Sequence, residues 1–245
     1  MTNHNKVALV TGASRGIGAA IARRLAQDGH AVVINHSGSA EPAAALAAEI
    51  EKGGGRALTI QSNVSDTKAV ARMFDSAEAA FGGIDVLVNN AGIMKLAKLA
   101  DSDDALIDSQ IAVNLRGTIN TLREAANRLR DGGRIVNLST SVVGLKLETY
   151  GVYAATKAAV ETLTGILSKE LRGRGITVNA VAPGPTATAL FLDGKSPELI
   201  ERMSKINPLE RLGTPEDIAA AVAFLVSTDG AWINGQVLRA NGGMI

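Results

Sequence analysis

Short apolar runs alternate with longer amphipathic stretches along this chain of 245 residues. The runs are continuously apolar, a pattern typical of strands that are buried on both faces of a sheet. They predict strands at residues 6–10, 31–35, 56–60, 84–90, 134–139, 176–182 and 235–240. The stretches between them predict helices at 17–28, 41–52, 67–80, 103–129, 152–172 and 216–227. Strands that alternate with helices indicate an α/β fold, a doubly wound parallel sheet of seven strands with helices on both faces.

Local signals support these boundaries at several helix ends. Asp66 and the pair Thr214-Pro215 are typical of helix starts, and Gly82-Gly83 follows a predicted helix. The signals agree with the alternation of strands and helices, so the pattern predicts a three-layer fold from end to end.

One segment interrupts the alternation. Residues 184–214 are rich in Gly, Pro, Thr and Ser, and a loop of that length is uncommon without a role. We interpret it either as a disordered insertion or as a mobile flap over a substrate site. We expect residues 1–5 to be a flexible tail and residues 6–245 to form a single domain.

The composition excludes several classes of function. With 25 basic and 24 acidic residues the formal charge is +1, which gives no support for a nucleic-acid partner. The chain has no cysteine, which excludes disulfides and thiolate catalysis, and its three histidines lack the spacing of metal ligands. No apolar run is long enough to span a membrane, and a strand follows the start without a signal-peptide pattern. We therefore expect a soluble, cytoplasmic protein without a metal.

A glycine-rich loop joins the first predicted strand to the first predicted helix. "TGASRGIG" (11–18) places Gly12, Gly16 and Gly18 where positive φ angles and close approach to a ligand are needed. The helix that follows directs free N–H groups and the positive end of its dipole toward an anion. A tight structural turn would use the same residues, but the strand–loop–helix context favours binding of a dinucleotide pyrophosphate.

Together with this loop, four further motifs resemble the short-chain dehydrogenase/reductase family. They are "NNAG" (89–92), Asn114, "YAATK" (153–157) and "PGPTAT" (183–188), in the order and at the separations of the family. "RGITVNAVAPG" (174–184) and "NGGM" (241–244) are similar to 3-oxoacyl-carrier-protein reductases. The resemblance implies a single Rossmann-like domain, assembled as a homotetramer or homodimer.

The end of the second strand predicts which dinucleotide is bound. An acidic residue there would bind both ribose hydroxyls of NAD(H) and repel a 2′-phosphate. This chain instead has Asn35, His36 and Ser37, with no carboxylate before Glu41. Arg15 in the glycine loop could pair with a phosphate, although a solvated Arg15 is the plainer interpretation. The absence of an acid favours NADP(H) over NAD(H).

The resemblance also implies the remaining cofactor contacts. Lys157 would bind the ribose hydroxyls next to the nicotinamide, close to Tyr153. Asn89 would stabilise the sheet without touching a ligand, and Pro183 could equally be a strand terminator. The residues implied are Gly12, Ser14, Arg15, Gly16, Ile17 and Gly18 in the loop; Asn63 and Val64 beside the adenine; Asn90, Ala91 and Gly92 beside its ribose; and Pro183, Gly184, Thr186 and Thr188 at the nicotinamide.

Tyr153 and Lys157 are the predicted catalytic pair. Hydride transfer to a carbonyl leaves an alkoxide that needs a proton, and a phenol has a pKa of about 10 in water. Residues four apart on a helix are neighbours, so the Lys157 ammonium should lower the pKa of the Tyr153 phenol. Tyr150 is two turns from Lys157 and is expected to be a pocket-wall residue.

Two further catalytic residues follow from the resemblance. Asn114 matches an asparagine that distorts the fourth helix and holds a water in a proton relay to Lys157. The hydroxyl that orients the substrate lies thirteen residues before the tyrosine in the family, which gives Thr140. The "VVG" that follows instead favours Ser141, so both stay open, and Ser139 is expected to end the strand.

These residues predict an enzyme that reduces a ketone or aldehyde with NADP(H). Its rivals are an NAD(P)-dependent alcohol or sugar dehydrogenase and a dinucleotide-binding regulator without catalysis. Flap residues Leu190, Phe191, Leu192, Ile200 and Met203 would either cover an apolar substrate or form a subunit contact. An acyl carrier protein is a further candidate partner, through Arg128, Arg130, Arg172 and Arg174.

Overall fold

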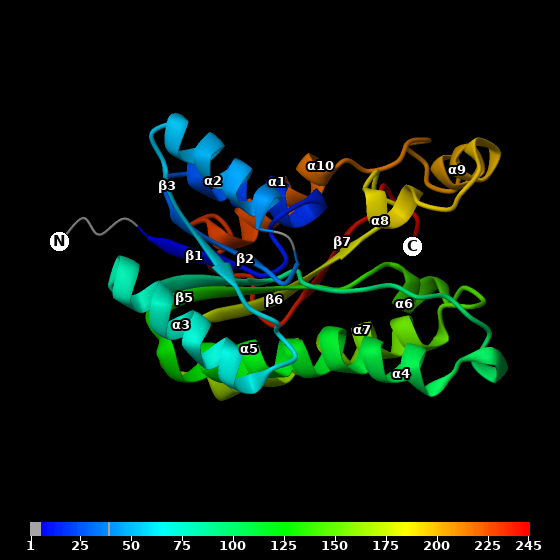
Figure 1. The fold of residues 1–245 in the computed structure, drawn as a ribbon. Helices are drawn as coiled ribbons and strands as arrows, with labels where there is room; N and C mark the ends of the chain where they lie inside the picture. The colour runs from blue at the N-terminus through cyan, green and yellow to red at the C-terminus, as the bar shows by residue number, and fades with distance from the viewer. Residues whose placement is uncertain (1–5, 39) are drawn as a thin grey trace.

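The computed structural model of the chain describes residues 6–38 and 40–245, so the tail predicted at residues 1–5 lies outside the described residues. Seven parallel strands form one sheet in the order β3-β2-β1-β4-β5-β6-β7. The chain therefore has the predicted Rossmann-like fold (Figure 1). The strands are β1 (Val7–Val10), β2 (Ala31–His36), β3 (Arg56–Gln61), β4 (Ile84–Asn89), β5 (Leu129–Leu138), β6 (Thr177–Pro183) and β7 (Val237–Ala240).

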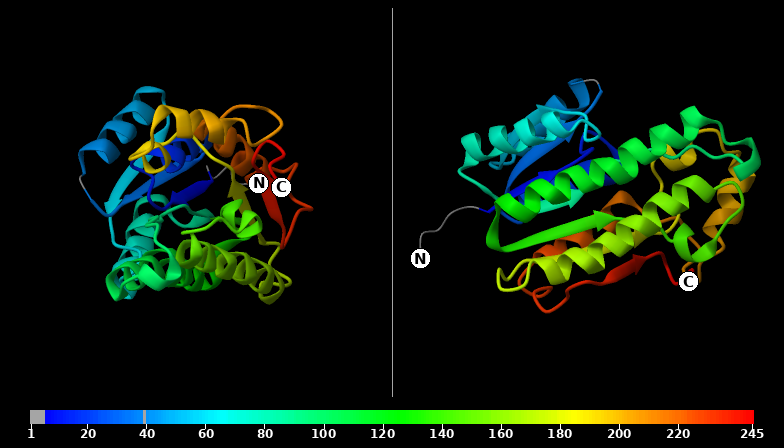
Figure 2. Two further views of the ribbon diagram at one scale, coloured as in Figure 1. Left: turned by 90° about the vertical axis from the view of Figure 1, so that its right-hand side faces the viewer. Right: turned by 90° about the horizontal axis from the view of Figure 1, so that it is seen from below.

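Helices cover both faces of this sheet and give the predicted three layers. Figure 1 shows α1 (Gly16–Gln27), α2 (Glu41–Lys52) and α10 (Pro215–Val226) on one face. The opposite face, seen from below in Figure 2, carries α3 (Thr67–Phe81), α4 (Asp104–Gln110), α5 (Gly117–Arg128) and α7 (Gly151–Glu170). Each face buries its own cluster of aliphatic side chains, so the sheet is apolar on both sides, as its continuous apolar runs predict.

The predicted helix starts are confirmed by their capping hydrogen bonds. The Asp66 carboxylate accepts from the main-chain N–H groups of Lys68 and Ala69 at the start of α3. Thr214 and Asp217 form a reciprocal capping box at the start of α10. Each cap satisfies N–H groups that the first turn of a helix leaves unpaired.

The helix predicted over 103–129 is not continuous. It consists of α4, a π-helical segment η2 (Ile111–Arg116) and α5, and it ends where β5 begins at Leu129. A short 3₁₀ turn, η1 (Leu99–Asp101), precedes it. π-Helical turns inside α-helices frequently mark functional positions, and this one contains Asn114.

The segment 184–214 folds into two short helices at the carboxyl ends of the strands. They are α8 (Ala189–Leu192) and α9 (Pro197–Ser204), and α6 (Val142–Leu145) lies at the same end of the molecule (Figure 1). Ligands of doubly wound sheets bind at this edge. In the described part of the chain, no helix combines the length and the apolar character needed to cross a bilayer.

Candidate active site

The glycine loop is pressed against the loop that follows β4. Gly12 has φ +61°, and a Cβ there would lie 2.8 Å from the Cα of Ala91. A Cβ at Gly18 would lie 2.4 Å from Nδ2 of Asn90 and 2.5 Å from the Gly12 oxygen. Asn90 Nδ2 in turn donates to the main-chain oxygens of Thr11 and Gly12. Only glycine fits these positions without movement of the neighbouring backbone.

A cavity of about 440 Å³ lies beside this loop. No side chain caps the start of α1, so the unpaired N–H groups of its first turn are available to a bound anion. This combination fits the phosphates and adenosine of a dinucleotide. The predicted cofactor residues that line the cavity are Gly12, Ser14, Arg15, Gly16, Ile17, Gly18, Asn35, His36, Ser37, Asn63, Val64, Asn90, Ala91, Gly92 and Thr188.

The three polar residues after β2 differ in what they can offer a ligand. Asn35 is buried, and its amide accepts from the N–H of Gly12 and donates to the main-chain oxygens of Ile60 and Ser62. This side chain therefore holds the loops together and has little capacity left for a ribose. Nδ1 of His36 lies 3.1 Å from the Gly38 oxygen, while Ser37 is exposed.

Arg15 is the one Lys or Arg among the described residues that line this cavity. It is exposed, lines the cavity and forms no ion pair within the described residues. A guanidinium without a carboxylate partner can bind a phosphate through two parallel hydrogen bonds. This cavity therefore suits the 2′-phosphate of NADP(H).

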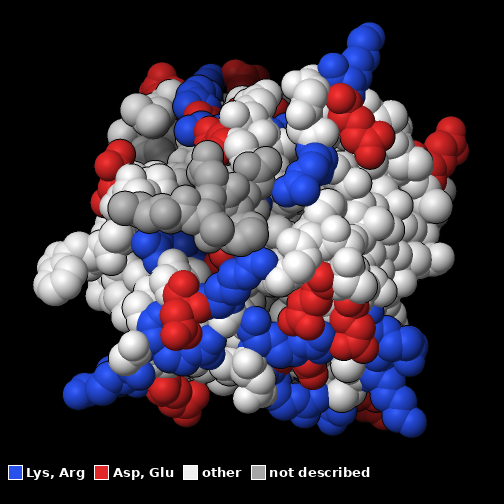
Figure 3. Space-filling model, turned by 90° about the vertical axis from the view of Figure 1, so that its left-hand side faces the viewer, with Lys and Arg blue, Asp and Glu red and all other residues white. Residues whose placement is uncertain are grey.

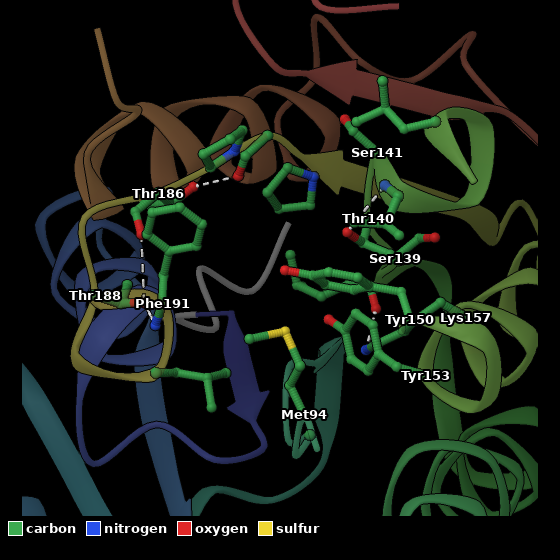
Figure 4. A pocket seen from close by; sticks show the side chains of 18 of the residues that line it. Met94, Ser139, Thr140, Ser141, Tyr150, Tyr153, Lys157, Thr186, Thr188 and Phe191 are labelled. Atoms are coloured by element: carbon green, nitrogen blue, oxygen red, sulfur yellow. Dashed lines mark hydrogen bonds between the residues drawn. The ribbon is translucent and has the colours of Figure 1, made fainter. Parts of the chain in front are cut away.

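A second cavity of about 200 Å³ adjoins the first and shares Ile17, Asn90, Gly92, Thr188 and Leu190 with it. Figure 4 shows its side chains, with Phe191 and Met94 facing Tyr150 and Tyr153 across the opening. The structure thus brings together residues from distant parts of the chain. The predicted site residues that line it are Thr140, Ser141, Tyr153, Lys157, Pro183, Gly184, Thr186 and Thr188.

Tyr153 and Lys157 lie one turn apart on α7. Nζ of Lys157 lies 5.9 Å from the centre of the Tyr153 ring and donates to the main-chain oxygen of Leu138 at 2.7 Å. Burial lowers the pKa of Lys157 to about 8, because the charged form loses its hydration. The ring of Tyr150 meets that of Tyr153 edge-on, at 6.4 Å between ring centres.

The expected lowering of the pKa of Tyr153 is wrong for this structure. Burial raises the pKa of this phenol to about 12, and Tyr150 adds to the increase, while a hydrogen bond with the Thr140 side chain opposes it. The Lys157 amine points to the Leu138 oxygen, and removal of the phenolate from water outweighs any stabilisation by that amine. Tyr153 is therefore a protonated phenol at neutral pH.

The three consecutive hydroxyls at the end of β5 face different partners. Ser139 Oγ donates to a carboxylate oxygen of Glu161 at 2.6 Å. Ser141 Oγ donates to the Ala182 oxygen and accepts from Nδ2 of Asn241. Thr140 alone interacts with the Tyr153 phenol, and its Oγ1 accepts from the N–H of Val142 at 3.3 Å. Of the three, only Thr140 retains a hydroxyl hydrogen that can be directed at a substrate oxygen beside Tyr153.

Asn114 is fully buried in the π-helical segment. Its Oδ1 accepts from the N–H of Ile93 at 2.8 Å, and its Nδ2 donates to the oxygen of the same residue at 2.9 Å. A Cβ on Gly92 would lie 3.3 Å from Asn114 Oδ1 and 3.5 Å from Lys157 Nζ. Asn114 therefore ties the loop after β4 to the helix, and its oxygen lies close to the lysine.

Three residues that line the second cavity, Val142, Ile206 and Met244, were not predicted, nor was the role of Asn241 beside Ser141. Asn241 anchors the last residues, because its Oδ1 accepts from the N–H groups of Gly243 and Met244 while its Nδ2 reaches Ser141. The "NGGM" motif was the available signal for this anchor. Of the predicted flap residues, Leu190, Phe191 and Met203 line the cavity, and Met94, Leu145 and Leu147 from the segments after β4 and β5 line it as well.

Most of the arginines considered as contacts for a carrier protein already form ion pairs within the chain. Arg128 pairs with Asp75, Glu78 and Glu124, Arg130 with Asp85, and Arg174 with Asp131. Basic and acidic side chains are interleaved over the lower part of the face shown in Figure 3. These pairs weaken the case for this group as a docking surface. Among the described residues, no three His, Asp or Glu side chains are grouped to hold a metal ion.

Comparisons with known proteins agree with this geometry. A family model described as enoyl-(acyl carrier protein) reductase matches residues 12–245. A chloroplastic NADPH-dependent aldehyde reductase-like protein of Arabidopsis thaliana is 45% identical over 254 residues, which cover 98% of this chain and 94% of the relative. A 3-oxoacyl-acyl-carrier-protein reductase of Staphylococcus aureus is 44% identical over 241 residues, which cover 98% of each.

The likeness extends to solved structures. A short chain dehydrogenase from Burkholderia cenocepacia J2315, in complex with NADP, superposes with a TM-score of 0.92 at 43% identity, and the match covers 98% of this chain and 97% of that one. Similarity of this extent in sequence and in fold makes the chain a member of the short-chain dehydrogenase/reductase family.

Proposed function

We propose that this chain is a reductase that uses NADP(H) to convert a ketone or aldehyde into an alcohol, with Tyr153 as the proton donor. The observation that carries the proposal is the position of the protonated Tyr153 phenol in a cavity that adjoins the glycine-loop cavity. The aldehyde reductase and NADP-bound relatives described above support the same cofactor and reaction.

Each residue of the site has a distinct task in this reaction. The glycine loop and Arg15 would hold the phosphates, and Lys157, Pro183, Gly184, Thr186 and Thr188 would hold the nicotinamide end. The chemistry that NADPH supplies when bound is hydride transfer to the carbonyl carbon. The Thr140 hydroxyl orients the carbonyl oxygen, and Tyr153 donates a proton to that oxygen as it gains negative charge. Lys157 and Asn114 would return a proton to Tyr153.

The raised pKa of Tyr153 suits the role of proton donor. A pKa raised to about 12 keeps the phenol protonated at neutral pH, which is the form that a proton donor needs. An alcohol dehydrogenase would need the phenolate, which this environment disfavours. A regulator without catalysis would not need Tyr153, Lys157 and Asn114 together.

The surface supports a proposal about assembly. Large apolar side chains are exposed on η2, α5 and α7 (Ile111, Ile119, Ile166) and near β7 (Trp232, Leu238). Trp232 is 98% exposed. We propose that these surfaces are covered in a homotetramer or homodimer, because isolated chains rarely expose such groups together. We also propose that the protein works in the cytoplasm and that an acyl carrier protein can present its substrate, as the name of the Staphylococcus aureus relative indicates for that protein.

The decisive experiment compares wild type with Tyr153→Phe. Turnover of carbonyl compounds is followed by NADPH absorbance, and cofactor binding by NADPH fluorescence. We expect the variant to bind NADPH as wild type does and to lose nearly all turnover. Tyr150→Phe is the matched control, because it removes a neighbouring phenol of the same cavity and should keep most of the activity. A Tyr153→Phe enzyme with wild-type turnover would refute the proposal.

A further inference from the structure

The wall of the cavity around Tyr153 is almost without charge. Of the described residues that line it, Lys157 is the one Lys or Arg, and none is an acid. Lys157 is only 5% exposed, donates to the Leu138 oxygen and is assigned to the nicotinamide end and the return of the proton, so it is not available to pair with a substrate carboxylate. A ligand that carried an ionised group into this cavity would therefore leave it without a partner.

The polar groups of the wall are mostly occupied as well. The Thr186 hydroxyl donates to the Gly184 oxygen, and Ser141 is bonded to Ala182 and Asn241. Thr140 and Tyr153 are needed for the reacting carbonyl. Tyr150 keeps a hydroxyl for which the described residues supply no hydrogen-bond partner, and it can serve at most one further polar atom of a substrate.

The rest of the wall is hydrocarbon and thioether. Met94 comes from the loop after β4, Leu147 from the loop after α6, Phe191 from α8, Met203 and Ile206 from α9 and the loop after it, and Met244 from the end of the sequence. Figure 4 shows Met94 and Phe191 directed into the cavity. Methionine side chains are flexible and polarisable, so a wall with three of them can adapt to apolar groups of different shape.

On these observations, and given the proposed function on which the inference rests, we propose that the enzyme selects compact, neutral carbonyl compounds with an apolar body. Burial of a hydroxyl or a carboxylate without partners is unfavourable, so polyhydroxylated and anionic carbonyl compounds are rejected. The cavity of about 200 Å³ lies below the roughly 300–1,000 Å³ of sites for drug-sized ligands, and the nicotinamide end would take part of it, so only a compact substrate fits beside the cofactor.

The test uses pairs of ketones that are similar in size and differ in polarity. Diethyl ketone is compared with dihydroxyacetone, and para-methylacetophenone with para-acetylbenzoate, each with NADPH. The methyl ester of para-acetylbenzoate controls for the electronic effect of the substituent. We expect kcat/KM to be at least about tenfold higher for the apolar member of each pair, with the ester close to para-methylacetophenone.

A variant supplies an independent measurement. Met94→Lys adds a cation to the wall and should raise kcat/KM for para-acetylbenzoate at least about fivefold while it lowers that for para-methylacetophenone. Met94→Gln is the matched control, because it adds polarity of similar length without charge and should not favour the carboxylate. Thermal unfolding of both variants checks that they are folded.

The outcomes separate the selectivity from the reaction. Wild-type enzyme that reduces para-acetylbenzoate as well as its ester, or dihydroxyacetone better than diethyl ketone, would overturn the inference and leave the reductase proposal intact. An enzyme that binds NADPH and reduces none of the carbonyl compounds would overturn the proposed function and the inference together.

Discussion

The side-chain amide of Asn241 donates a hydrogen bond to the Ser141 hydroxyl, 3.0 Å away, although the two residues are 100 positions apart in the sequence. Ser141 also donates to the Ala182 oxygen at 3.2 Å. Both bonding directions of the hydroxyl are therefore directed at the protein, and Ser141 joins the end of β5 to the last residues of the chain. The neighbouring Thr140 hydroxyl does not join these two segments and interacts with the Tyr153 phenol.

This relationship predicts different effects for Thr140→Val and Ser141→Ala. Thr140→Val keeps the shape and removes the hydroxyl that orients the substrate, so kcat should fall about a hundredfold with little change in stability. Ser141→Ala should keep kcat within a few-fold and lower the free energy of unfolding by about 1 kcal/mol, because a buried hydrogen bond is lost. Steady-state kinetics and urea unfolding measure both. The reverse pattern would assign the orienting role to Ser141.

Features of the fold and the site that depend on neighbouring residues were predictable from the sequence, and features that depend on distant residues were not. Gly12 and Gly18 were predictable because a strand–glycine–helix pattern has few structural solutions, and Asp66 and Thr214 because a cap needs only the adjoining turn. The choice between Thr140 and Ser141 depends on Asn241, which no local pattern connects to them. The ion pairs of Arg128 with three carboxylates, which weaken the carrier-protein hypothesis, were likewise not predictable from any local pattern.

The pKa of Tyr153 illustrates the same limit. Four residues of helix suffice to place a lysine beside a tyrosine, so the pair was predictable. Whether the lysine lowers the pKa of the tyrosine depends on the burial of the phenol, on the neighbouring Tyr150 and on the Leu138 oxygen that the lysine binds. The π-helical break at 111–116 likewise coincides with a tertiary contact, between Asn114 and the main chain of Ile93, which no local pattern reveals.

The buried Lys157 makes stability depend on pH in a defined direction. Its pKa is about 8 in the folded chain, against 10.5 for a lysine exposed to water, so between these values the unfolded chain binds more protons. The contribution of Lys157 to stability is therefore least favourable below pH 8 and improves as the pH rises toward 10.5. The Tyr153 phenol acts in the opposite sense only above about pH 10, where its stabilising contribution begins to fall.

We expect this dependence to disappear in Lys157→Met. Relative to wild type, the free energy of unfolding of the variant should fall by about 2 kcal/mol between about pH 7 and pH 9.5, because the wild type alone gains stability over that range. Urea unfolding at both pH values measures the difference. Lys169→Met, at an exposed position of the same helix, is the control and should show no change. A constant difference between Lys157→Met and wild type would contradict the burial of a charged lysine.

Arg15 is predicted to set the preference for NADP(H). Arg15→Ala should weaken NADPH binding about ten- to a hundredfold, the range expected when charge-assisted hydrogen bonds to a phosphate are lost, and should leave NADH binding within about twofold. Fluorescence titration with each cofactor measures the ratio. Arg23→Ala, on the helix that follows the glycine loop, is the matched control, because Arg23 pairs with Glu49 and does not line the cofactor cavity. Equal losses for NADPH and NADH would place Arg15 away from the 2′-phosphate.

Asn114 and Asn179 offer a test that separates a structural from a functional role. Both are buried, and both side-chain amides accept one hydrogen bond from the main chain and donate one to it: Asn114 with Ile93, and Asn179 with Gln236 and Ile233.

Replacement of either asparagine by alanine leaves buried main-chain groups unpaired, so each variant should lose about 2–4 kcal/mol of stability. Of the two, only Asn114 lies near Lys157, because a Cβ on Gly92 would meet both Asn114 Oδ1 and Lys157 Nζ. We therefore expect Asn114→Ala to lose at least about tenfold in kcat under conditions where it is fully folded, while Asn179→Ala keeps wild-type kcat. Circular dichroism and steady-state kinetics on the same samples measure both properties. Equal kcat in the two folded variants would reduce Asn114 to a structural residue and remove it from the proton relay.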